Sequence, residues 1–273
     1  MKLSLDFNGA QVWVDTAAPL EISIPLDFHG DQPRSFGVPS ASAAPLKTGD
    51  FIGDTRSGGS CNVECYSFIT HCNGTHTECV GHITEARLSI LDVLKDSFAT
   101  ACVVSVTPSP ARSSAEHASV PFEKGDSLIT AAALSAQLVK VAGPHSALII
   151  RTLPNSSGKS VRDYGANPAA FISLEAAQLI VEKGFRHILL DVPSLDRASD
   201  EGKLSAHRIF WGLIEGDKGQ PRAEYLPKTI TEFVFVPDSV KDGSYLLQIE
   251  IAPFIADAAP SRVRLYRMRR ENE

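Results

Sequence analysis

The sequence lacks any continuous apolar segment of the roughly 18 residues that a membrane-spanning helix needs. Its longest strongly apolar run, Ala147 to Ile150, is only long enough for one strand. The first 15 residues, MKLSLDFNGAQVWVD, contain one lysine and no continuous apolar run, so we expect no secretory signal peptide. These absences predict a cytoplasmic protein that does not enter a membrane.

The chain also lacks an excess of positively charged residues. The chain has 26 Lys and Arg against 32 Asp and Glu, which gives a net charge of −6 and a pI of about 5.8. Proteins that bind nucleic acid or anionic membranes usually carry a basic surface. The composition therefore predicts neither of these partners, and we expect a small-molecule substrate instead.

Cysteine is infrequent, with five residues among 273. A chain of this length buries enough apolar surface to fold without disulfides, and an odd number of cysteines cannot pair completely. We interpret all five as reduced thiols of a cytoplasmic protein. The alternative is an exported protein with two disulfides and one free thiol, and no signal peptide supports it.

No internal repeat, heptad pattern or shift in composition divides the chain, so we predict a single domain over residues 1–273. Three helices are predicted, over residues 130–139, over residues 173–184 and from about Leu204. Thr130 and Ser173 are suitable N-cap residues for the first two. Gly184 is placed to end the second helix.

Strands are predicted where apolar and β-branched residues alternate or form short runs. They are expected at residues 10–14, 20–26, 63–70, 101–107, 146–152, 186–192, 230–236, 245–251 and 263–268. The strand–helix–strand order between residues 146 and 192 is typical of a βαβ unit and indicates a mixed α/β fold. Residues 29–60 are rich in Gly, Pro, Ser and Asp, and we interpret them as a long loop. This loop either has a function or is a surface loop without one.

One segment, residues 70–83 (THCNGTHTECVGHI), is dense in metal-binding and proton-carrying side chains. These side chains are His71, Cys72, His76, Glu78, Cys79 and His82. His76 and Glu78 are two residues apart and would share one face of an extended strand. A bulge or turn at Gly74 and Gly81 could bring the remaining donors to the same point.

Thiolate, imidazole and carboxylate are all ligands that zinc accepts, so a metal site is the favoured interpretation of this segment. Three alternatives remain. The segment could be a buried strand whose histidines bond to the backbone. Cys72 or Cys79 could be a nucleophile activated by a neighbouring histidine. The regularly spaced cysteines could also form disulfides, which conflicts with a cytoplasmic location.

The segment from Cys72 to His82 resembles the signature of the cyclase superfamily of metal-dependent hydrolases, which includes bacterial kynurenine formamidases (arylformamidases). That signature reads His-x-Gly-Thr-His-x-Asp-x-Pro-x-His. The matching residues are Gly74, Thr75, His76 and His82, and the departures are Cys72 for His, Glu78 for Asp and Val80 for Pro.

Other parts of the chain resemble the same family, in the same order. Residues 20–23 are similar to its opening Asp-Ile-Ser strand, and residues 191–196 to its Asp-x-x-Ser-x-Asp loop. Ala206-His207 and Thr231-Glu232-Phe233 are similar to later segments that supply a ligand histidine and a ligand glutamate. The resemblance therefore covers roughly residues 20–268.

The resemblance implies a swivelling β/β/α domain, with a central mixed sheet or flattened barrel and flanking helices. It implies metal ligands at Cys72, His76, Glu78, His207 and Glu232, with His82 as the general acid/base. The metal would be zinc, or alternatively manganese. The resemblance also implies a homo-oligomer, a dimer or tetramer, in which a neighbouring chain can contribute to the substrate pocket.

Elementary chemistry tolerates the departures. Glu78 keeps a carboxylate ligand at the position of Asp. Cys72 would add a negative charge, which reduces the Lewis acidity of the metal. His71 could replace the missing imidazole, but adjacent side chains of a strand point to opposite faces, so we rank it second. Asp191 and Asp196 could orient ligands or bracket the loop, and we favour the alternative that they form an Asx-type turn around Pro193.

Phe36 and Arg34, in the long early loop, could form a wall of the substrate pocket or a plain surface. Taken together, the sequence predicts a metal-dependent hydrolase of a small amide, formamide or cyclic ester-like substrate. His82 would transfer the proton, since the usual pKa of histidine, about 6.5, suits this task near neutral pH. One alternative is a non-catalytic descendant that binds a metabolite. A weaker one is a thiol enzyme that uses Cys72.

Overall fold

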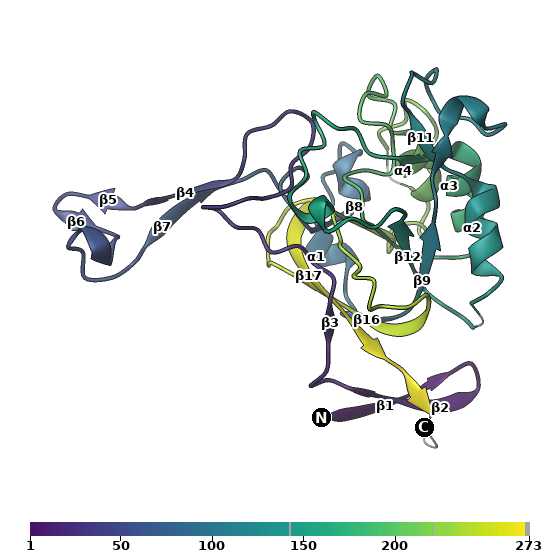
Figure 1. Ribbon diagram of the computed structural model, residues 1–273, viewed down its shortest axis with the longest axis horizontal. Helices are drawn as coiled ribbons and strands as arrows, with labels where there is room; N and C mark the ends of the chain where they lie inside the picture. Colours follow the sequence, from purple (N-terminus) through teal and green to yellow (C-terminus); the bar gives the residue numbers. More distant parts are fainter. Residues whose placement is uncertain (142, 220, 271–273) are drawn as a thin grey trace.

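The computed structural model describes residues 1–141, 143–219 and 221–270, and its centre is a closed seven-stranded barrel (Figure 1). Around the barrel the strands are β16 (Gly243–Ile251), β9 (Phe98–Val106), β12 (Ala147–Thr152), β14 (His187–Leu190), β15 (Thr229–Glu232), β8 (His76–Cys79) and β17 (Ala258–Arg267). Pairing of β16 with β17 closes the ring. Strands β9, β12, β14 and β15 run parallel, and the other three are antiparallel to their neighbours. The predicted mixed α/β fold is confirmed.

The barrel strands are buried on both faces, and their alternation assigns each residue to one of two cores. Cys102, Leu148 and Ile188 point to the core beneath the helices, whereas their neighbours Val103 and Ile149 point to the barrel interior. Since successive side chains of a strand face opposite sides, a run of apolar residues such as 147–150 fills both cores at once.

Three helices cover one side of the barrel: α2 (Ala131–Leu138), α3 (Leu174–Glu182) and α4 (Ser205–Phe210) (Figure 1). The predicted caps are confirmed, because Thr130 Oγ1 accepts from Ala133 N and Ser173 Oγ accepts from Ala176 N. Gly184 follows α3 with a φ of 78°. None of the described helices is long and apolar enough to cross a bilayer.

Smaller elements surround the barrel. They are β1 (Lys2–Phe7), β2 (Ala10–Asp15), β3 (Leu20–Glu21), β10 (Ser109–Pro110), β11 (Ser127–Ile129), β13 (Phe171–Ile172), β18 (Arg269–Arg270), α1 (Ile90–Val93) and the 3-10 turns η2 (Val80–His82), η3 (Ala111–Ser113) and η4 (Ser157–Val161). β1, β2 and β18 form a sheet beside both ends of the chain (Figure 1). The strand predicted at 20–26 is shorter than expected, since β3 ends at Glu21 and Ser23 makes only an isolated bridge to Val234.

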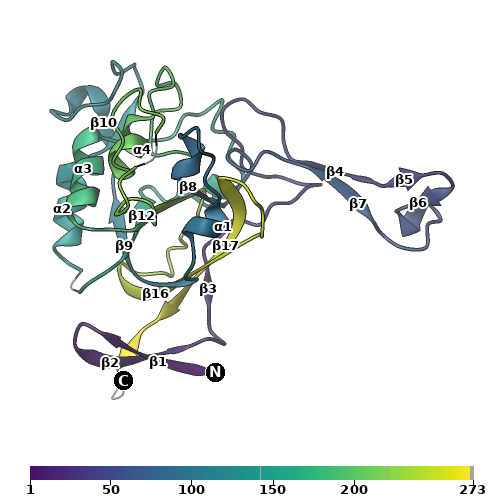
Figure 2. The same ribbon diagram turned by 180° about the vertical axis from the view of Figure 1, so that it is seen from behind.

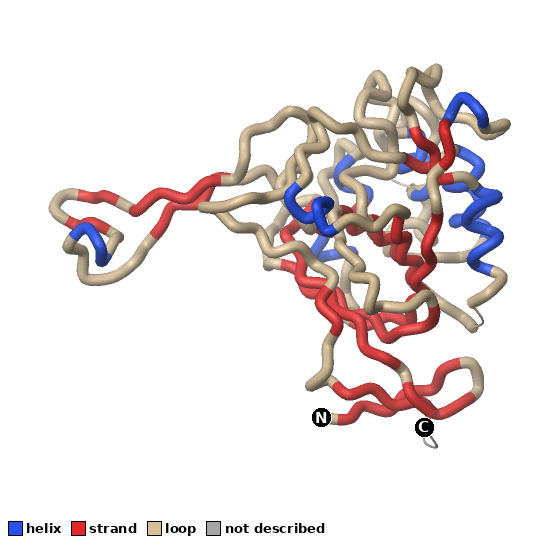
Figure 3. Tube along the Cα trace, in the orientation of Figure 1, coloured by secondary structure: helices blue, strands red, loops and turns tan. Residues whose placement is uncertain are grey.

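Part of the predicted loop 29–60 is instead a two-stranded arm that projects from the barrel (Figures 2 and 3). Its strands are β4 (Ser42–Pro45) and β7 (Glu64–Ser67), and its tip contains β5 (Lys47–Thr48), β6 (Phe51–Ile52) and η1 (Thr55–Ser57). No residue of β4 or β7 is buried. β7 confirms the strand predicted at 63–70, whereas β4 was missed because, without a core face, it lacks the apolar alternation that identifies a strand from sequence.

Behind the parallel strands, Lys159 and Asp191 form a buried ion pair. Lys159 Nζ lies 2.7 Å from Asp191 Oδ2 and 2.9 Å from Thr152 Oγ1, and the backbone N–H of Thr152 also donates to Asp191. Burial raises the pKa of Asp191, and the attraction of Lys159 opposes this shift. Asp191 thus fixes the loop after β12 instead of forming the Asx-type turn expected from sequence.

We predict that Lys159→Met destabilises the fold by about 3 kcal/mol, because it leaves the Asp191 carboxylate buried without a cation. Urea denaturation followed by circular dichroism measures this loss. The matched control is Lys140→Met, since Lys140 is exposed and its Nζ bonds only to Gln137. Its expected effect is within about 0.5 kcal/mol. Equal losses for the two variants would contradict the role of the ion pair.

Candidate metal centre

Strand β8 lies between β15 and β17 and carries the centre of the candidate site. His76 and Glu78 share one face of β8, as their two-residue spacing predicts. In the register of β8 with β15, His76 is directly opposite Glu232. His207 reaches the same point from α4. Segments far apart in the sequence are therefore brought together by sheet pairing and one helix.

Four of these side chains form what we call the inner group: His76, Glu78, His207 and Glu232. Each side chain is at most 5% exposed. His207 Nε2 lies 3.1 Å from Glu78 Oε1 and 3.7 Å from Glu232 Oε1. His76 Nε2 lies 3.4 Å from Glu232 Oε2. Ligands about 2.0–2.1 Å from a tetrahedral zinc ion lie roughly 3.4 Å from one another, so this spacing suits a metal ion.

Hydrogen bonds orient the two imidazole rings of the inner group. His207 Nδ1 donates to Asp196 Oδ2 at 2.6 Å, and His76 Nδ1 donates to the carbonyl of Gly74 at 3.0 Å. His207 Nε2 donates in turn to Glu78 Oε1 at 3.1 Å. His76 Nε2 is buried and has no hydrogen-bond partner among the described residues. Such outer partners are typical of metal-binding histidines, and the residues present therefore fit a divalent ion.

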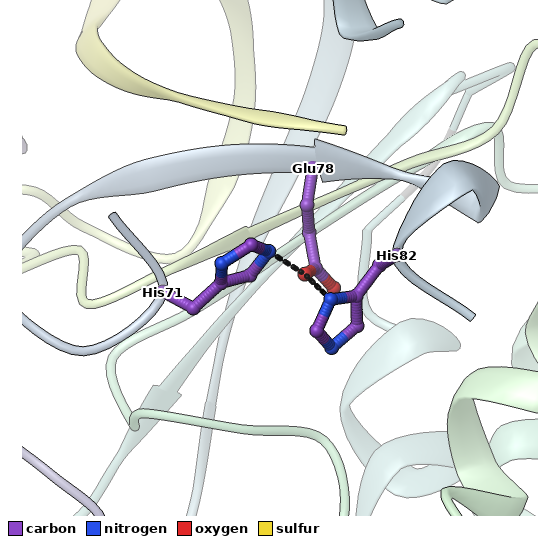
Figure 4. A group of neighbouring side chains, drawn as sticks. All are labelled: His71, Glu78 and His82. Atoms are coloured by element: carbon purple, nitrogen blue, oxygen red, sulfur yellow. Dashed lines mark ion pairs between the residues drawn. The ribbon is translucent and has the colours of Figure 1, made fainter. Parts of the chain in front are cut away.

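A second cluster, here called the outer group, lies on the more exposed side of Glu78 and consists of His71, His82 and Asp257. Figure 4 shows the two histidines turned toward the carboxylate of Glu78. Glu78 Oε2 lies 3.4 Å from His71 Nε2 and 3.9 Å from His82 Nδ1. Asp257 Oδ2 lies 3.0 Å and 3.4 Å from the same two nitrogens. The rings stack with centroids 4.3 Å apart, and their side chains are 27% and 28% exposed.

The charges of the two groups are strongly coupled. Burial raises the pKa of Glu78, but the neighbouring His82, His207 and His71 outweigh it and hold this pKa at about 2. Burial lowers the pKa of His207, yet the carboxylates of Asp196 and Glu78 hold it well above its usual value. The site therefore keeps its carboxylates ionised and attracts positive charge.

In the outer group, too, burial and neighbouring charges shift the pKa values in opposite directions. Hydrogen bonds from His71 and His82 lower the pKa of Asp257, although burial opposes them. Burial lowers the pKa of His71, but Asp257 and Glu78 raise it overall. A cation, either a proton or a metal ion, is therefore favoured between these carboxylates.

Cys72 lies in neither group of ligand atoms among the described residues, whereas His71 lies in one. The ranking of these two residues assumed a strand, but residues 70–75 form a turn and β8 begins only at His76. Strand alternation therefore does not apply to them. Burial, together with the charge of Glu232, raises the pKa of the Cys72 thiol to about 11.

Cys79 is also a protonated thiol at neutral pH. Its Sγ donates to the carbonyl of Leu88 at 3.2 Å, and burial raises its pKa to about 12. A nucleophilic cysteine needs a thiolate, which a neighbouring cation or helix N-terminus usually stabilises. Neither Cys72 nor Cys79 has such an environment, so the geometry gives no support to a thiol enzyme.

The two residues expected to wall the pocket differ in position. Phe36, which is 47% exposed, lines a cavity of about 490 Å³ together with Tyr164. Tyr164 packs edge-on against Phe233 at 5.8 Å, and Phe233 lies 6.1 Å from His76. Phe233 therefore lies between Tyr164, which lines the cavity, and His76, and no residue of the inner group lines the cavity itself. Arg34 does not line the cavity and instead pairs with Asp163 at 2.8 Å.

Two residues of the site were not identified from sequence. Asp196 was expected in an Asx-type turn, but its carboxylate accepts from Ala206 N and His207 N as well as from His207 Nδ1, so that expectation is wrong. Asp257 lies in the loop between β16 and β17, where no motif marks it. Its carbonyl accepts from Cys79 N, which fixes the loop against β8.

In a comparison with known protein families, the Cyclase family model matches residues 2–197. The chain belongs to the Cyclase family. The match includes Cys72, His76, Glu78 and His82 and ends before His207 and Glu232. No curated protein sequence matches the chain.

Solved structures share the Cyclase fold at low sequence identity. One is described as a predicted metal-dependent hydrolase from Bacillus stearothermophilus, with 16% identity, a TM-score of 0.57 and coverage of 91% of this chain and 98% of that one. A second, a potential metal-dependent hydrolase with cyclase activity, has 15% identity, a TM-score of 0.60 and coverage of 91% and 97%. A third is an isatin hydrolase bound to the product analogue thioisatinate, with 13% identity, a TM-score of 0.58 and coverage of 92% of both chains.

We predict that Asp196→Asn weakens zinc binding about 10- to 100-fold, because it removes the charged acceptor that orients His207. Competition with a chromogenic chelator measures the affinity. Asp92→Asn is the control, since Asp92 is exposed and pairs only with Lys95. Unchanged zinc affinity in the Asp196 variant would show that this carboxylate only caps α4.

Proposed function

We propose that this member of the Cyclase family is a metal-dependent hydrolase that cleaves the C–N bond of a small amide, formamide or lactam, or the related bond of a cyclic ester. The observation that carries this proposal is the inner group, in which the carboxylates of Glu78 and Glu232 lie buried beside the Nε2 atoms of two histidines. The partly exposed His82 lies beside it. This arrangement combines a metal-binding centre with a proton carrier that solvent and substrate can reach.

Each group has a separate task in this mechanism. His76, Glu78, His207 and Glu232 would hold the divalent ion, most simply zinc. When bound, such an ion polarises a carbonyl and lowers the pKa of water. His82 takes the proton of the attacking water and returns it to the leaving nitrogen. Its Nδ1 faces Asp257 and Glu78, which leaves Nε2 for this transfer.

The cavity that Phe36 and Tyr164 line supports a small aromatic substrate. Phe36 and Tyr164 supply flat apolar surface, and at about 490 Å³ the cavity is of the size that small ligands occupy. One structural neighbour is named an isatin hydrolase, and isatin is a cyclic aromatic amide. We therefore propose arylformamides and aromatic lactams as the first substrates to test.

We also propose that His71, and not Cys72, supplies the remaining imidazole ligand. His71 Nε2 is buried and lies 3.4 Å from Glu78 Oε2 and 3.0 Å from Asp257 Oδ2, so its nitrogen faces two carboxylates. Burial and the charge of Glu232 raise the pKa of the Cys72 thiol to about 11, which disfavours formation of a thiolate at this position. Manganese is the alternative to zinc, since carboxylates contribute much of the ligand set.

The roles of His71 and Cys72 are separated by elemental analysis of the purified proteins after dialysis against zinc. We expect Cys72→Ala to retain the wild-type metal content and His71→Ala to lose part of it, because a ligand is removed. Circular dichroism verifies that both variants are folded. The opposite ranking would assign the ligand role to Cys72. A wild-type chain that binds no metal would favour the non-catalytic, metabolite-binding alternative.

We expect His82→Ala to retain metal but to lose about 10²- to 10⁴-fold in kcat, because proton transfer is lost while the inner group stays intact. Formanilide and lactam hydrolysis by the zinc-loaded proteins provides the measurement. His29→Ala is a suitable control, since His29 is exposed and pairs with Glu64 away from the centre. Unchanged turnover would remove His82 from the mechanism. A metal-loaded wild-type chain without turnover would again support the metabolite-binding alternative.

Two further expectations stay predictions. We propose a homo-oligomer, and the projecting arm, with Tyr66 57% exposed, supports it by offering surface for a second copy of the chain. We also propose a cytoplasmic location, and the five free cysteines support it.

A further inference from the structure

A second cavity, of about 720 Å³, lies at the carboxyl ends of three parallel strands, and we call it the strand-end cavity. Thr107 follows β9, Thr152 ends β12 and Val192 follows β14, and all three line it. In α/β folds with parallel strands, ligands commonly bind at this edge. None of the residues of the inner and outer groups lines this cavity, so it is separate from the metal centre.

The charged residues that line the strand-end cavity are both cationic. Lys159 is already neutralised by Asp191. Arg162 donates through Nε and Nη2 to the carbonyls of Asn167 and Pro168, and it has no carboxylate partner among the described residues. No carboxylate lines the cavity. One uncompensated positive charge therefore faces it, which favours an anionic ligand.

Tyr164 forms the wall between this cavity and the smaller cavity that Phe36 lines. Tyr164 is only 3% exposed, yet its hydroxyl has no hydrogen bond to any residue in the part of the chain that the structure describes. This hydroxyl is not among the fully buried polar atoms that lack a partner, so it reaches space that a ligand can occupy. The Arg162 guanidinium lies over the Tyr164 ring, 4.9 Å from its centre, so the two side chains that carry these donors are in contact.

The remainder of the wall is largely apolar. Pro108, Leu153, Pro154, Ala169 and Ala170 contribute most of it. A cavity of this size with a few polar groups that converge at one point suits a small ligand with an apolar body. A highly charged ligand such as a polyphosphate would leave charges without partners here.

We propose that the strand-end cavity binds a small apolar monocarboxylate, whose carboxylate accepts hydrogen bonds from Arg162 and the Tyr164 hydroxyl. Since Arg162 Nε and Nη2 donate to backbone carbonyls, its Nη1 would supply one charge-assisted hydrogen bond and the Tyr164 hydroxyl a second. A carboxylate is also the product class of the proposed hydrolysis. The inference does not depend on that activity, since no residue of the metal centre contributes to the cavity.

The test is a calorimetric titration of the purified protein with benzoate and, separately, with the isosteric but neutral benzamide. We expect benzoate to bind with one site per chain, and benzamide to bind at least about tenfold more weakly, because it lacks the charge. Arg162→Gln and Tyr164→Phe should each weaken benzoate binding about tenfold. Tyr164→Phe keeps the ring against Phe233, so its effect does not arise from lost packing.

The matched control is Arg186→Gln, because Arg186 is an exposed arginine at the amino end of β14, opposite to the cavity. This variant should bind benzoate like the wild type. A second titration, after removal of metal with EDTA, distinguishes this site from benzoate bound at a metal ion. Binding that disappears with the metal, that survives both cavity substitutions, or that is equal for benzamide would overturn the proposal. Absence of benzoate binding would overturn it as well. None of these outcomes bears on the hydrolase test with the His82 variant.

Discussion

A carboxylate that is fully buried, such as that of Glu78, remains ionised only where neighbouring groups supply positive charge. Glu78 has such groups on both sides, with His207 at one oxygen and His71 and His82 at the other. His207 belongs to α4, His82 to η2 and His71 to the turn before β8. If one of these three elements moved away, the Glu78 carboxylate would lose part of its positive surroundings, so their positions are linked to this one side chain.

The barrel makes this arrangement rigid. β8 is paired on both edges, with β15 and with β17, so neither Glu78 nor His76 can move along the strand. The same register fixes Glu232 opposite His76. Asp196 connects His207 to the start of α4, so one carboxylate both caps the helix and orients a ligand. Stability and metal binding thus rely on the same hydrogen bonds.

Local patterns in the sequence predicted the features that depend on local geometry. The shared face of His76 and Glu78 follows from strand alternation, and Thr130 was identified as a cap from its residue type and position. Asp257 and His71 join the site through pairing of distant segments and through a turn, which no local pattern encodes. The first strand of the arm, β4, was missed for a related reason, because a strand without a buried face has no hydrophobic alternation.

The substitution of Cys72 for the family's first histidine is consistent with the charge of the centre. The buried centre already contains the carboxylates of Glu78 and Glu232. A Cys72 thiolate would add a further negative charge in a buried site, at a high cost in free energy. Burial and the charge of Glu232 raise the pKa of this thiol to about 11, which acts against the thiolate. Under the proposal that His71 is a ligand, an imidazole would supply a nitrogen donor without adding negative charge, and the Lewis acidity of the ion would be preserved.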